Sequence, residues 1–302
     1  MKKKYKWVTV AAMLAAAAAA FCIWQNNGLT VSHSVLTAGN VPSAFDGYTI
    51  VQISDLHNKE FGGGQRRLLS KLAEQDPDLI VITGDMIDSR WTDVGPALDF
   101  ARKAVKLAPC FYVPGNHEKR VPDAYEELKA GLADCGVKIL ENEKISLEQD
   151  GAELTMVGVL DPVFCVGTAD EAGNLLIDER SVMKSQLAEL VAQSADSQGG
   201  EFTVLLSHRP ELLDLYGAAG VDLVFAGHAH GGQWRLPGLG GLIAPMQGFF
   251  PKYTDGVHTS GRTAMYISRG LGNSLIPIRI FNRPELVVVE LQCGIGQNRS
   301  ST

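Results

Sequence analysis

The chain has 302 residues, of which 45% are hydrophobic and 20% charged, and its formal net charge is -7. A chain of this size and composition buries a large core, so we expect one catalytic domain. The sequence pI of about 5.5 excludes the basic surface with which proteins bind a nucleic-acid backbone. We therefore expect no nucleic-acid partner.

The amino terminus has the pattern of a membrane-targeting segment. Four lysines among the first six residues precede an uncharged stretch, residues 7–24, with tryptophan at both ends. At about 1.5 Å per helical residue this stretch just spans a thin hydrocarbon core, and tryptophan suits both interfaces. Because no Lys or Arg follows until Lys59, the positive-inside rule predicts a single-pass protein of the cell membrane with its catalytic domain outside the cytoplasm.

A cleaved signal peptide is the alternative for this segment, since residues 18–20 are alanines that suit a peptidase, and cleavage yields a secreted protein. Residues 1–25 are thus an anchor or signal segment, residues 26–47 a polar linker with a short strand at 31–36, and residues 48–302 the catalytic domain. Four cysteines of this domain are scattered, which excludes a thiolate metal site and leaves one disulfide possible.

The domain alternates apolar strands with amphipathic helices. Residues 79–82 form an uninterrupted apolar run that is typical of a parallel strand covered on both faces. The other predicted strands are residues 48–54, 110–113, 137–140, 145–149, 153–160, 201–206, 222–226, 263–268 and 285–292. The predicted helices are residues 65–75, 95–108, 123–135 and 178–195. The hairpin at 145–160 makes the arrangement a mixed α/β fold.

Polar side chains follow five of these strands, at the point where each strand ends. They are Asp55, His57, Asp85, Asn116, His117, His208, His228 and His230. One strand-end histidine is usually structural, but five of the seven histidines in the chain lie at such positions. The carboxyl ends of neighbouring parallel strands meet at one edge, and imidazole and carboxylate groups bind divalent transition metals. The pattern therefore predicts a metal centre.

The order Asp-x-His, Gly-Asp, Gly-Asn-His-Glu, His and Gly-His-x-His resembles the calcineurin-like metallophosphoesterases, over residues 48–292. Residues 227–238, 268–272 and 279–285 are similar to a membrane-associated bacterial branch, which includes phosphodiesterases and a UDP-2,3-diacylglucosamine pyrophosphatase. The resemblance implies a four-layer αββα sandwich in which two mixed sheets pack together between outer helices.

The resemblance also implies two divalent metal ions bridged by Asp85. One ion is expected on Asp55, His57, Asp85 and His230, and the other on Asp85, Asn116, His208 and His228. Such mixed nitrogen and oxygen ligands accept Mn, Fe, Zn, Co or Ni. A metal pair lowers the pKa of water and clamps the attacking and leaving oxygens of an in-line displacement.

The implied activity is hydrolysis of a phosphodiester or diphosphate by metal-activated hydroxide. We expect His117 to contact the phosphate and to protonate the leaving oxygen, whereas Arg209, Arg269 and Arg279 are either substrate contacts or structural cations. Two alternatives are a non-catalytic metal-binding scaffold of the same fold and a binuclear hydrolase of a non-phosphate substrate such as a lactam. The intact ligand set argues against the first, and the Gly-Asn-His-Glu element argues against the second.

Apolar residues also occur on three predicted loops, residues 61–64, 162–166 and 245–251. Their aromatic rings either fold back into the core or surround the metal site. In the second arrangement they receive an acyl chain, which predicts a lipid-linked phosphate ester as substrate.

Overall fold

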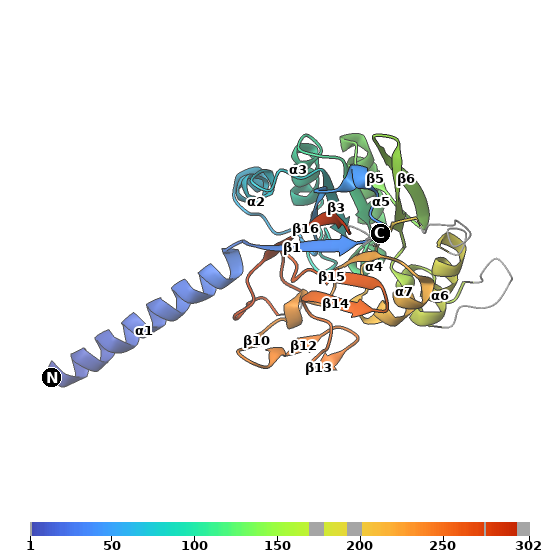
Figure 1. Ribbon diagram of the computed structural model, residues 1–302. Helices are drawn as coiled ribbons and strands as arrows, with labels where there is room; N and C mark the ends of the chain where they lie inside the picture. Colours follow the sequence, from blue (N-terminus) through green and yellow to red (C-terminus); the bar gives the residue numbers. More distant parts are fainter. Residues whose placement is uncertain (1, 169–177, 192–200, 275, 295–302) are drawn as a thin grey trace, which may run out of the picture.

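The structure is a computed structural model that describes residues 2–168, 178–191, 201–274 and 276–294. Two six-stranded mixed sheets pack face to face, and helices cover their outer faces (Figure 1). This arrangement confirms the predicted four-layer αββα sandwich. The predicted helix 178–195 is present over α6 (Glu179–Leu190), and its residues beyond 191 lie outside the described part of the chain.

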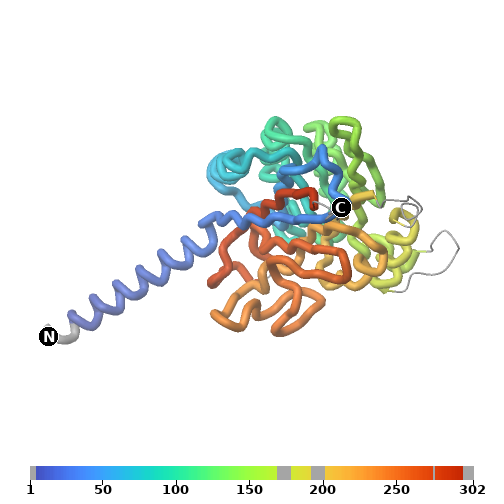
Figure 2. The backbone as a smooth tube through the Cα atoms, in the orientation of Figure 1, coloured from blue at the N-terminus to red at the C-terminus, as the bar shows by residue number. Residues whose placement is uncertain are grey.

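The first sheet contains the strand around which the site is built. Its strands, in spatial order, are β1 (Thr30–Ala38), β16 (Glu285–Cys293), β2 (Thr49–Ile53), β3 (Leu79–Thr83), β4 (Cys110–Val113) and β5 (Lys138–Ile139). Strands β2 to β5 are parallel, whereas β16 runs antiparallel to β2. Strand β1 contains the short strand predicted at residues 31–36 within the linker, and it pairs with β16 in parallel as an edge strand (Figure 2).

The second sheet combines a parallel centre with antiparallel edges. Its strands, in spatial order, are β14 (Gly256–Ser260), β15 (Thr263–Ile267), β9 (Leu223–Ala226), β8 (Thr203–Leu206), β7 (Ala152–Gly158) and β6 (Glu143–Gln149). The predicted hairpin is the pair β6 and β7, which turns at Asp150 and Gly151 with φ of 49° and 78°. Strands β7, β8, β9 and β15 are parallel.

Burial on both faces explains why β3 has no polar alternation. Leu79 and Val81 face the core between the sheets, and Ile80 and Ile82 face the core beneath the outer helices. Those helices are α2 (Arg66–Ala73), α3 (Gly95–Ala104) and α5 (Pro122–Cys135), while α6 and α7 (Leu213–Ala219) cover the second sheet. The polar residues after β3 therefore emerge at a sheet edge between two apolar layers.

Helix α1 (Lys2–Asn27) projects from the domain as a long single helix (Figure 2). Its segment Tyr5–Asn27 has a mean hydropathy of 2.0, and its apolar window is fully exposed. By length and composition this helix is able to cross a membrane. All five cysteines, each within the described residues, are free of disulfides.

Several short elements between β9 and β14 were not predicted. They include the small hairpins β10 (Arg235–Leu236) with β11 (Gly240–Gly241), and β12 (Ile243–Ala244) with β13 (Gly248–Phe249). Helix α7 and the short α4 (Asn116–Arg120) were also missed. Loops on this side of the domain therefore carry more local structure than their glycine-rich sequence indicates.

Candidate metal centre

The side chains predicted to hold metals come together beyond the carboxyl ends of five strands. Asp55 and His57 follow β2, Asp85 follows β3, Asn116 follows β4, His208 follows β8, and His228 and His230 follow β9. Each of them is at most 7% exposed. Seven separately weak positions thus form one buried polar cluster.

The backbone at these positions is unusual in a way that supports a functional role. Five of the residues have left-handed backbone angles, with φ of 52° at Asp55, 47° at His57, 52° at Asp85, 66° at His228 and 48° at His230. Residues other than glycine adopt this region rarely, and such strain gathers at functional sites. Gly115 leaves room for the cluster, since a Cβ there would lie 2.3 Å from Asp85 Oδ1.

One group of ligand atoms matches the first predicted metal position. Ligand atoms of Asp55, His57, Asp85 and His230 all lie within 4.8 Å of one another. The Nε2 atoms of His57 and His230 are 3.1 Å apart, and His57 Nε2 is 3.5 Å from Asp85 Oδ2. Asp55 Oδ1 lies 3.3 Å from His230 Nε2.

A second group shares Asp85 with the first. His208 Nε2 lies 3.3 Å from Asp85 Oδ2 and 3.1 Å from His228 Nδ1. The carbonyl of Thr83 is 2.7 Å from His208 Nδ1, which places the proton on Nδ1 and leaves Nε2 free to bind a cation. Among the described residues, the buried Oδ1 of Asn116 has no hydrogen-bond partner.

These contacts fit a pair of cations. Two imidazole nitrogens that face each other at 3.1 Å need a proton or a cation between them, and this occurs twice, for His57 with His230 and for His208 with His228. The two groups of ligand atoms that share Asp85 contain two carboxylates, those of Asp55 and Asp85. The donor set of imidazole, carboxylate and amide oxygen suits divalent transition metals.

Burial and charge prepare these groups for metal binding. Burial lowers the pKa of His57 to about 3 and holds the pKa of His228 and His230 well below its usual value, so these rings are neutral ligands near pH 7. Burial opposes the charge on Asp85, but His208 and the other histidines outweigh it and hold the pKa of this carboxyl well below its usual range. Asp85 is therefore the permanent anion between the two groups.

His117 lies beside the cluster with its tautomer determined by the backbone. The Ser89 N–H donates to His117 Nδ1 at 3.1 Å, so the neutral ring carries its proton on Nε2. Asp88 lies between two rings, with Oδ1 4.0 Å from His117 Nδ1 and Oδ2 3.6 Å from His57 Nδ1. The sequence analysis assigned no role to Asp88. Its position three residues after Asp85 was the feature that could have indicated one.

Glu118 is a second buried residue whose role was not predicted. Its carboxylate accepts the backbone N–H groups of Asp85 at 3.0 Å, Met86 at 2.8 Å and Gly115 at 2.8 Å. Burial, followed by the Asp85 charge, raises the pKa of Glu118 to about 8. Glu118 thus binds the loop after β3 to the loop after β4 and positions Asp85.

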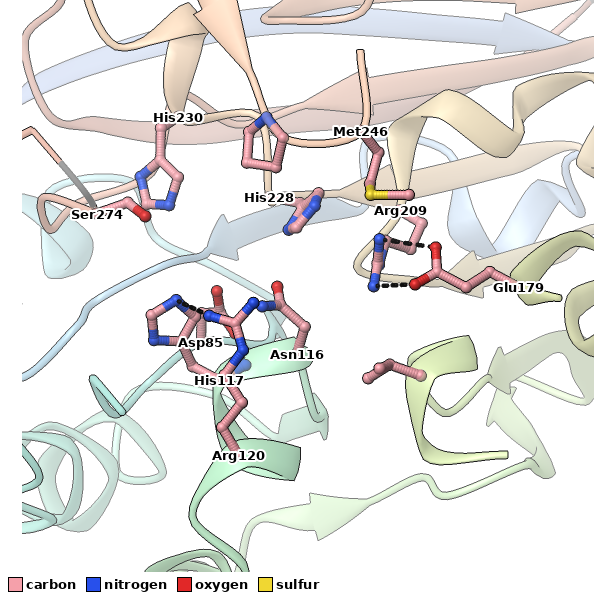
Figure 3. Close-up of a pocket in the computed structure, with 12 residues that line it drawn as sticks. Asp85, Asn116, His117, Arg120, Glu179, Arg209, His228, His230, Met246 and Ser274 are labelled. Carbon is pink, nitrogen blue, oxygen red and sulfur yellow. Dashed lines mark hydrogen bonds and ion pairs between the residues drawn. The ribbon is translucent and has the colours of Figure 1, made fainter. Parts of the chain in front are cut away.

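A cavity of about 230 Å³ opens above the cluster and is shown in Figure 3. Asp85, Asn116, His117, His228 and His230 form its base. Its walls are Arg120, Val163, Glu179, Arg209, Pro245, Met246 and Ser274. The cavity therefore gives a substrate access to the predicted ligands.

Arg120 is the cation that the sequence analysis missed. It reaches into the cavity beside His117 and Asn116, with Nη1 3.5 Å from His117 Nε2 (Figure 3). Within the described residues it forms no ion pair with a carboxylate. Arg120 lies four residues after Asn116, on the same face of α4. This spacing could have indicated that Arg120 belongs to the site.

The three arginines considered at the sequence level have structural partners instead. Arg209 Nη2 donates to Asp161 at 2.9 Å and pairs with Glu179, and Arg269 pairs with Glu285 at 2.8 Å. The buried Arg279 donates to backbone carbonyl groups. All three therefore have structural partners, and Arg209 in addition lines the cavity.

The aromatic rings of two of the three apolar loops fold back into the domain, whereas Val163 of the second loop lines the cavity. Phe61 is buried, and Phe164 packs against Tyr125 with ring centroids 5.7 Å apart. Phe249 and Phe250 remain 71% and 62% exposed. Only the third loop therefore presents aromatic rings to its surroundings.

Comparison with known proteins identifies the class to which this fold and site belong. Residues 48–232 match the family model of the calcineurin-like phosphoesterases, and the chain belongs to this family. Enzymes of the family are hydrolases that use divalent metals, so the chain is a metallophosphoesterase.

Individual relatives include the metallophosphoesterase YkuE of Bacillus subtilis, which is 29% identical over 273 residues, 87% of this chain and 85% of the relative. The phosphodiesterase YaeI of Escherichia coli is 26% identical, over 81% of this chain and 82% of its own length. A zebrafish (Danio rerio) transmembrane protein with a metallophosphoesterase domain is 24% identical, over 83% of this chain and 55% of its own length. Among solved structures, a 5'-nucleotidase precursor from Thermus thermophilus aligns with a TM-score of 0.48 and 17% identity, over 74% of this chain and 49% of that chain.

Proposed function

We propose that this protein is a binuclear metallophosphoesterase that hydrolyses a phosphodiester or a diphosphate. The observation that carries the proposal is the position of Asp85, whose carboxylate belongs to both groups of ligand atoms. The two groups correspond to a pair of cation positions with one shared anion. The chain's similarity to a phosphodiesterase, YaeI, supports the choice of substrate class.

The protein's own charges favour an anionic substrate. Two divalent cations, when bound, supply a nucleophile from water at neutral pH and stabilise the oxygens of an in-line displacement. Asp55 and Asp85 neutralise only part of their charge, because Asn116 and the rings of His57, His228 and His230 are neutral ligands. The cavity thus retains a net positive charge that attracts a phosphate group.

We expect His117 to act on the substrate, and its ring also forms a third group of ligand atoms with His57 and Asp88. The Ser89 N–H donates to Nδ1, which leaves Nε2 beside the cavity, 3.5 Å from Arg120 Nη1. Burial lowers the pKa of His117, so the free enzyme holds a neutral ring that donates one hydrogen bond to a phosphate oxygen. An anionic phosphate next to the ring raises this pKa and prepares His117 to protonate the leaving oxygen.

Arg120 supplies a second contact to the phosphate. Its guanidinium is free of carboxylate partners in the described structure and lies next to His117 Nε2. A guanidinium offers paired N–H donors that match two phosphate oxygens, in a charge-assisted contact. Arg120 and His117 therefore bind the phosphate from the side opposite His228 and His230 (Figure 3).

Turnover of two model substrates tests this proposal. Purified protein is treated with a chelator and then assayed with a chromogenic aryl phosphodiester and with a chromogenic lactam, before and after addition of Mn²⁺, Zn²⁺, Fe²⁺, Co²⁺ or Ni²⁺. We expect metal-dependent hydrolysis of the phosphodiester alone. Lactam hydrolysis would instead show a non-phosphate hydrolase, and metal binding without turnover of either substrate would show a scaffold.

We further propose that the substrate is lipid-linked and that α1 anchors the enzyme in the membrane. The exposed Phe249 and Phe250 follow Pro245 and Met246, which line the cavity, so they are available to an acyl chain that leaves it. Each buried CH₂ group contributes about 0.8 kcal/mol, so a few methylenes change specificity more than tenfold. In a phosphodiester series, kcat/KM should rise with acyl length. Equal efficiency on short and long chains would exclude the lipid-linked substrate.

The proposed topology places the amino terminus in the cytoplasm and the catalytic domain outside. A reporter that works only after export, fused to the carboxyl terminus, should be active. Membranes should also retain the full-length chain after a high-salt wash. Activity of a cytoplasm-dependent reporter would reverse the orientation, whereas release of a shortened chain would favour signal cleavage.

A further inference from the structure

Large apolar side chains gather on three loops beside the cavity. They are Trp234, Leu236, Leu239, Phe249, Phe250 and Phe281, and they are between 37% and 71% exposed. We call this group the apolar platform. A single exposed apolar residue is ordinary, but a group of them marks a surface that contacts a partner or a lipid.

Hydrogen bonds hold the three loops of the platform together. Leu242 N donates to Trp234 O at 2.8 Å, and Phe250 N donates to Leu242 O at 2.9 Å. The indole Nε1 of Trp234 donates to Ile278 O at 2.8 Å, and the backbone of Trp234 forms a bridge with Ile280. The platform is therefore one tied surface rather than three independent loops.

The end of α1 packs against the same surface. The rings of Phe21 and Phe281 are 5.5 Å apart, and the Arg283 guanidinium lies 4.7 Å from the Trp24 ring centre. The side chain of Gln25, 3% exposed, accepts a hydrogen bond from the Asn282 backbone at 3.2 Å. Helix α1 is thus joined to the loop that carries Phe281, so the direction of the helix relative to the platform is determined.

This connection determines the depth of the platform in a membrane. Tryptophan near the end of a spanning helix lies at the interface, so Phe21, about one turn before Trp24, lies near the hydrocarbon boundary. Phe281 contacts Phe21 and therefore reaches the same depth. In Figure 1, α1 runs from the domain downward to the amino terminus, and the hairpins that contain β10 and β12 lie on the same, lower side of the domain.

We propose that the apolar platform rests on the bilayer that α1 crosses, on the side of the catalytic domain, and thereby holds the cavity at the level of the lipid head groups. This inference rests on the proposed membrane anchoring. Pro245 and Met246 line the cavity and also connect β12 to β13, which carries Phe249. The cavity and the platform therefore share a hairpin, and a lipid-linked phosphate reaches the site without leaving the membrane surface.

Site-specific photocrosslinking to lipid tests this arrangement in the full-length chain. A photoreactive phenylalanine derivative is placed at position 239 on the platform, at 14 within α1, or at 150 in the β6–β7 turn, which lies at the opposite end of the domain (Figure 1). Each protein is reconstituted into vesicles of phosphatidylcholine and phosphatidylglycerol in equal parts, with a radiolabelled phosphatidylcholine tracer.

We expect lipid crosslinks at positions 14 and 239 and none at 150. Crosslinks at 14 alone would overturn the platform while leaving the anchor intact. Equal labelling at 239 and 150 would also overturn it, because it shows no preferred orientation. Absence of label at 14 would refute the membrane anchoring itself, and the metal-dependent phosphodiesterase assay tests the enzyme assignment separately.

A charge variant gives a second, functional test. In the double variant Leu236→Asp/Leu239→Asp, turnover of a phosphodiester lipid embedded in the same vesicles should fall about tenfold, since carboxylates disfavour contact with the membrane. Turnover of a soluble aryl phosphodiester should stay unchanged, because neither leucine lines the cavity. The exposed Leu107→Asp is the matched control and should behave as wild type on both substrates. Unchanged turnover of the embedded lipid in the double variant would contradict the platform.

Discussion

The predicted metal ligands and the mouth of the cavity differ in where they lie and in what we expect them to determine. The ligands, such as Asp85 and His208, are buried at strand ends, and their neighbours leave little freedom of movement. The mouth is formed by Arg120 on a short helix and by Met246 on a loop. We infer from this difference that the sheets determine which reaction is possible. The short helix and the loops determine which phosphate ester reaches the predicted ligands.

The largest effect is expected at the shared anion. Asp85→Asn should abolish phosphodiesterase activity and lower metal content at both positions, because two cations lose the negative charge between them. Elemental analysis of the purified variant, alongside its turnover, measures both effects. Asp150→Asn, in an exposed turn, is the control and should match the wild type. Wild-type turnover in metal-free Asp85→Asn protein would refute the role of this residue.

Removal of His117 should separate chemistry from metal binding. We expect His117→Ala to keep its metals and to lose on the order of 10²-fold in kcat, the usual cost of losing a general acid. His258→Ala is the matched control, since His258 lies on β14 outside the cavity. If metal content falls together with turnover in His117→Ala, the residue supports the ligands instead of the reaction.

Arg120 should affect the substrate at the mouth more than the metals below it. Arg120→Gln should lower kcat/KM for a phosphodiester about tenfold, the size expected for one charge-assisted hydrogen bond, and metal content should not change. Arg120→Lys should recover part of the loss. The exposed Arg102→Gln, on α3, serves as the control. Unchanged kcat/KM in Arg120→Gln would remove this residue from the site.

A smaller and substrate-dependent effect is expected on the third apolar loop. Phe249→Ser/Phe250→Ser should flatten the dependence of kcat/KM on acyl length while preserving metal content, because the variant removes apolar surface next to the cavity. The exposed Leu107→Ser is the control for general loss of surface hydrophobicity. An unaltered dependence on acyl length would place the acyl chain elsewhere.

The pH dependence of the metal-free protein should be modest and have a maximum. Burial lowers the pKa of His57, His228 and His230. Below about pH 6.5 the unfolded chain therefore binds protons that the folded chain does not bind, and the free energy of unfolding falls with acidification. For His208, burial is outweighed by Asp85, which raises the pKa to about 10. The folded chain then holds a proton that the unfolded chain releases above about pH 6.5, so stability also falls toward pH 10.

Burial raises the pKa of Asp55 to about 6 and that of Glu118 to about 8, so both carboxyls offset part of the loss on the acidic side without removing it, and Glu118 adds to the loss up to about pH 8. Burial lowers the pKa of Lys59 to about 7, which opposes the loss above that pH. We therefore expect the Tm of the chelated protein to be highest near pH 6.5, a value that thermal scans across a pH series measure. A Tm that rises steadily from neutral to alkaline pH would contradict the coupling of His208 with Asp85.

The convergence of the candidate ligands was predictable because it depends on order along the chain. Asp55, His57 and Asp85 each follow an apolar strand, and parallel strands bring their carboxyl ends to one edge. The fold class followed from the same alternation together with the family resemblance. Neither inference required knowledge of which side chains touch.

The remaining parts depend on contacts between distant segments. Arg209 pairs with Asp161 and Glu179, and no local sequence pattern predicts those partners. The short strand at residues 31–36 was predicted, but its partner was not, because β1 pairs with β16 across most of the chain. Arg120 was missed because no helix was predicted at residues 116–120, whereas α4 places this side chain at the cavity.

Metal titration of the wild type tests the central claim most directly. Chelated protein receives increasing Mn²⁺ while bound metal and turnover of an aryl phosphodiester are measured together. Because Asp85 belongs to both ligand groups, we predict that activity appears only as the second equivalent binds, and that Asp85→Asn protein shows neither full occupancy nor turnover. Full activity in the chelated protein, or at a single equivalent of metal, would contradict a binuclear phosphoesterase.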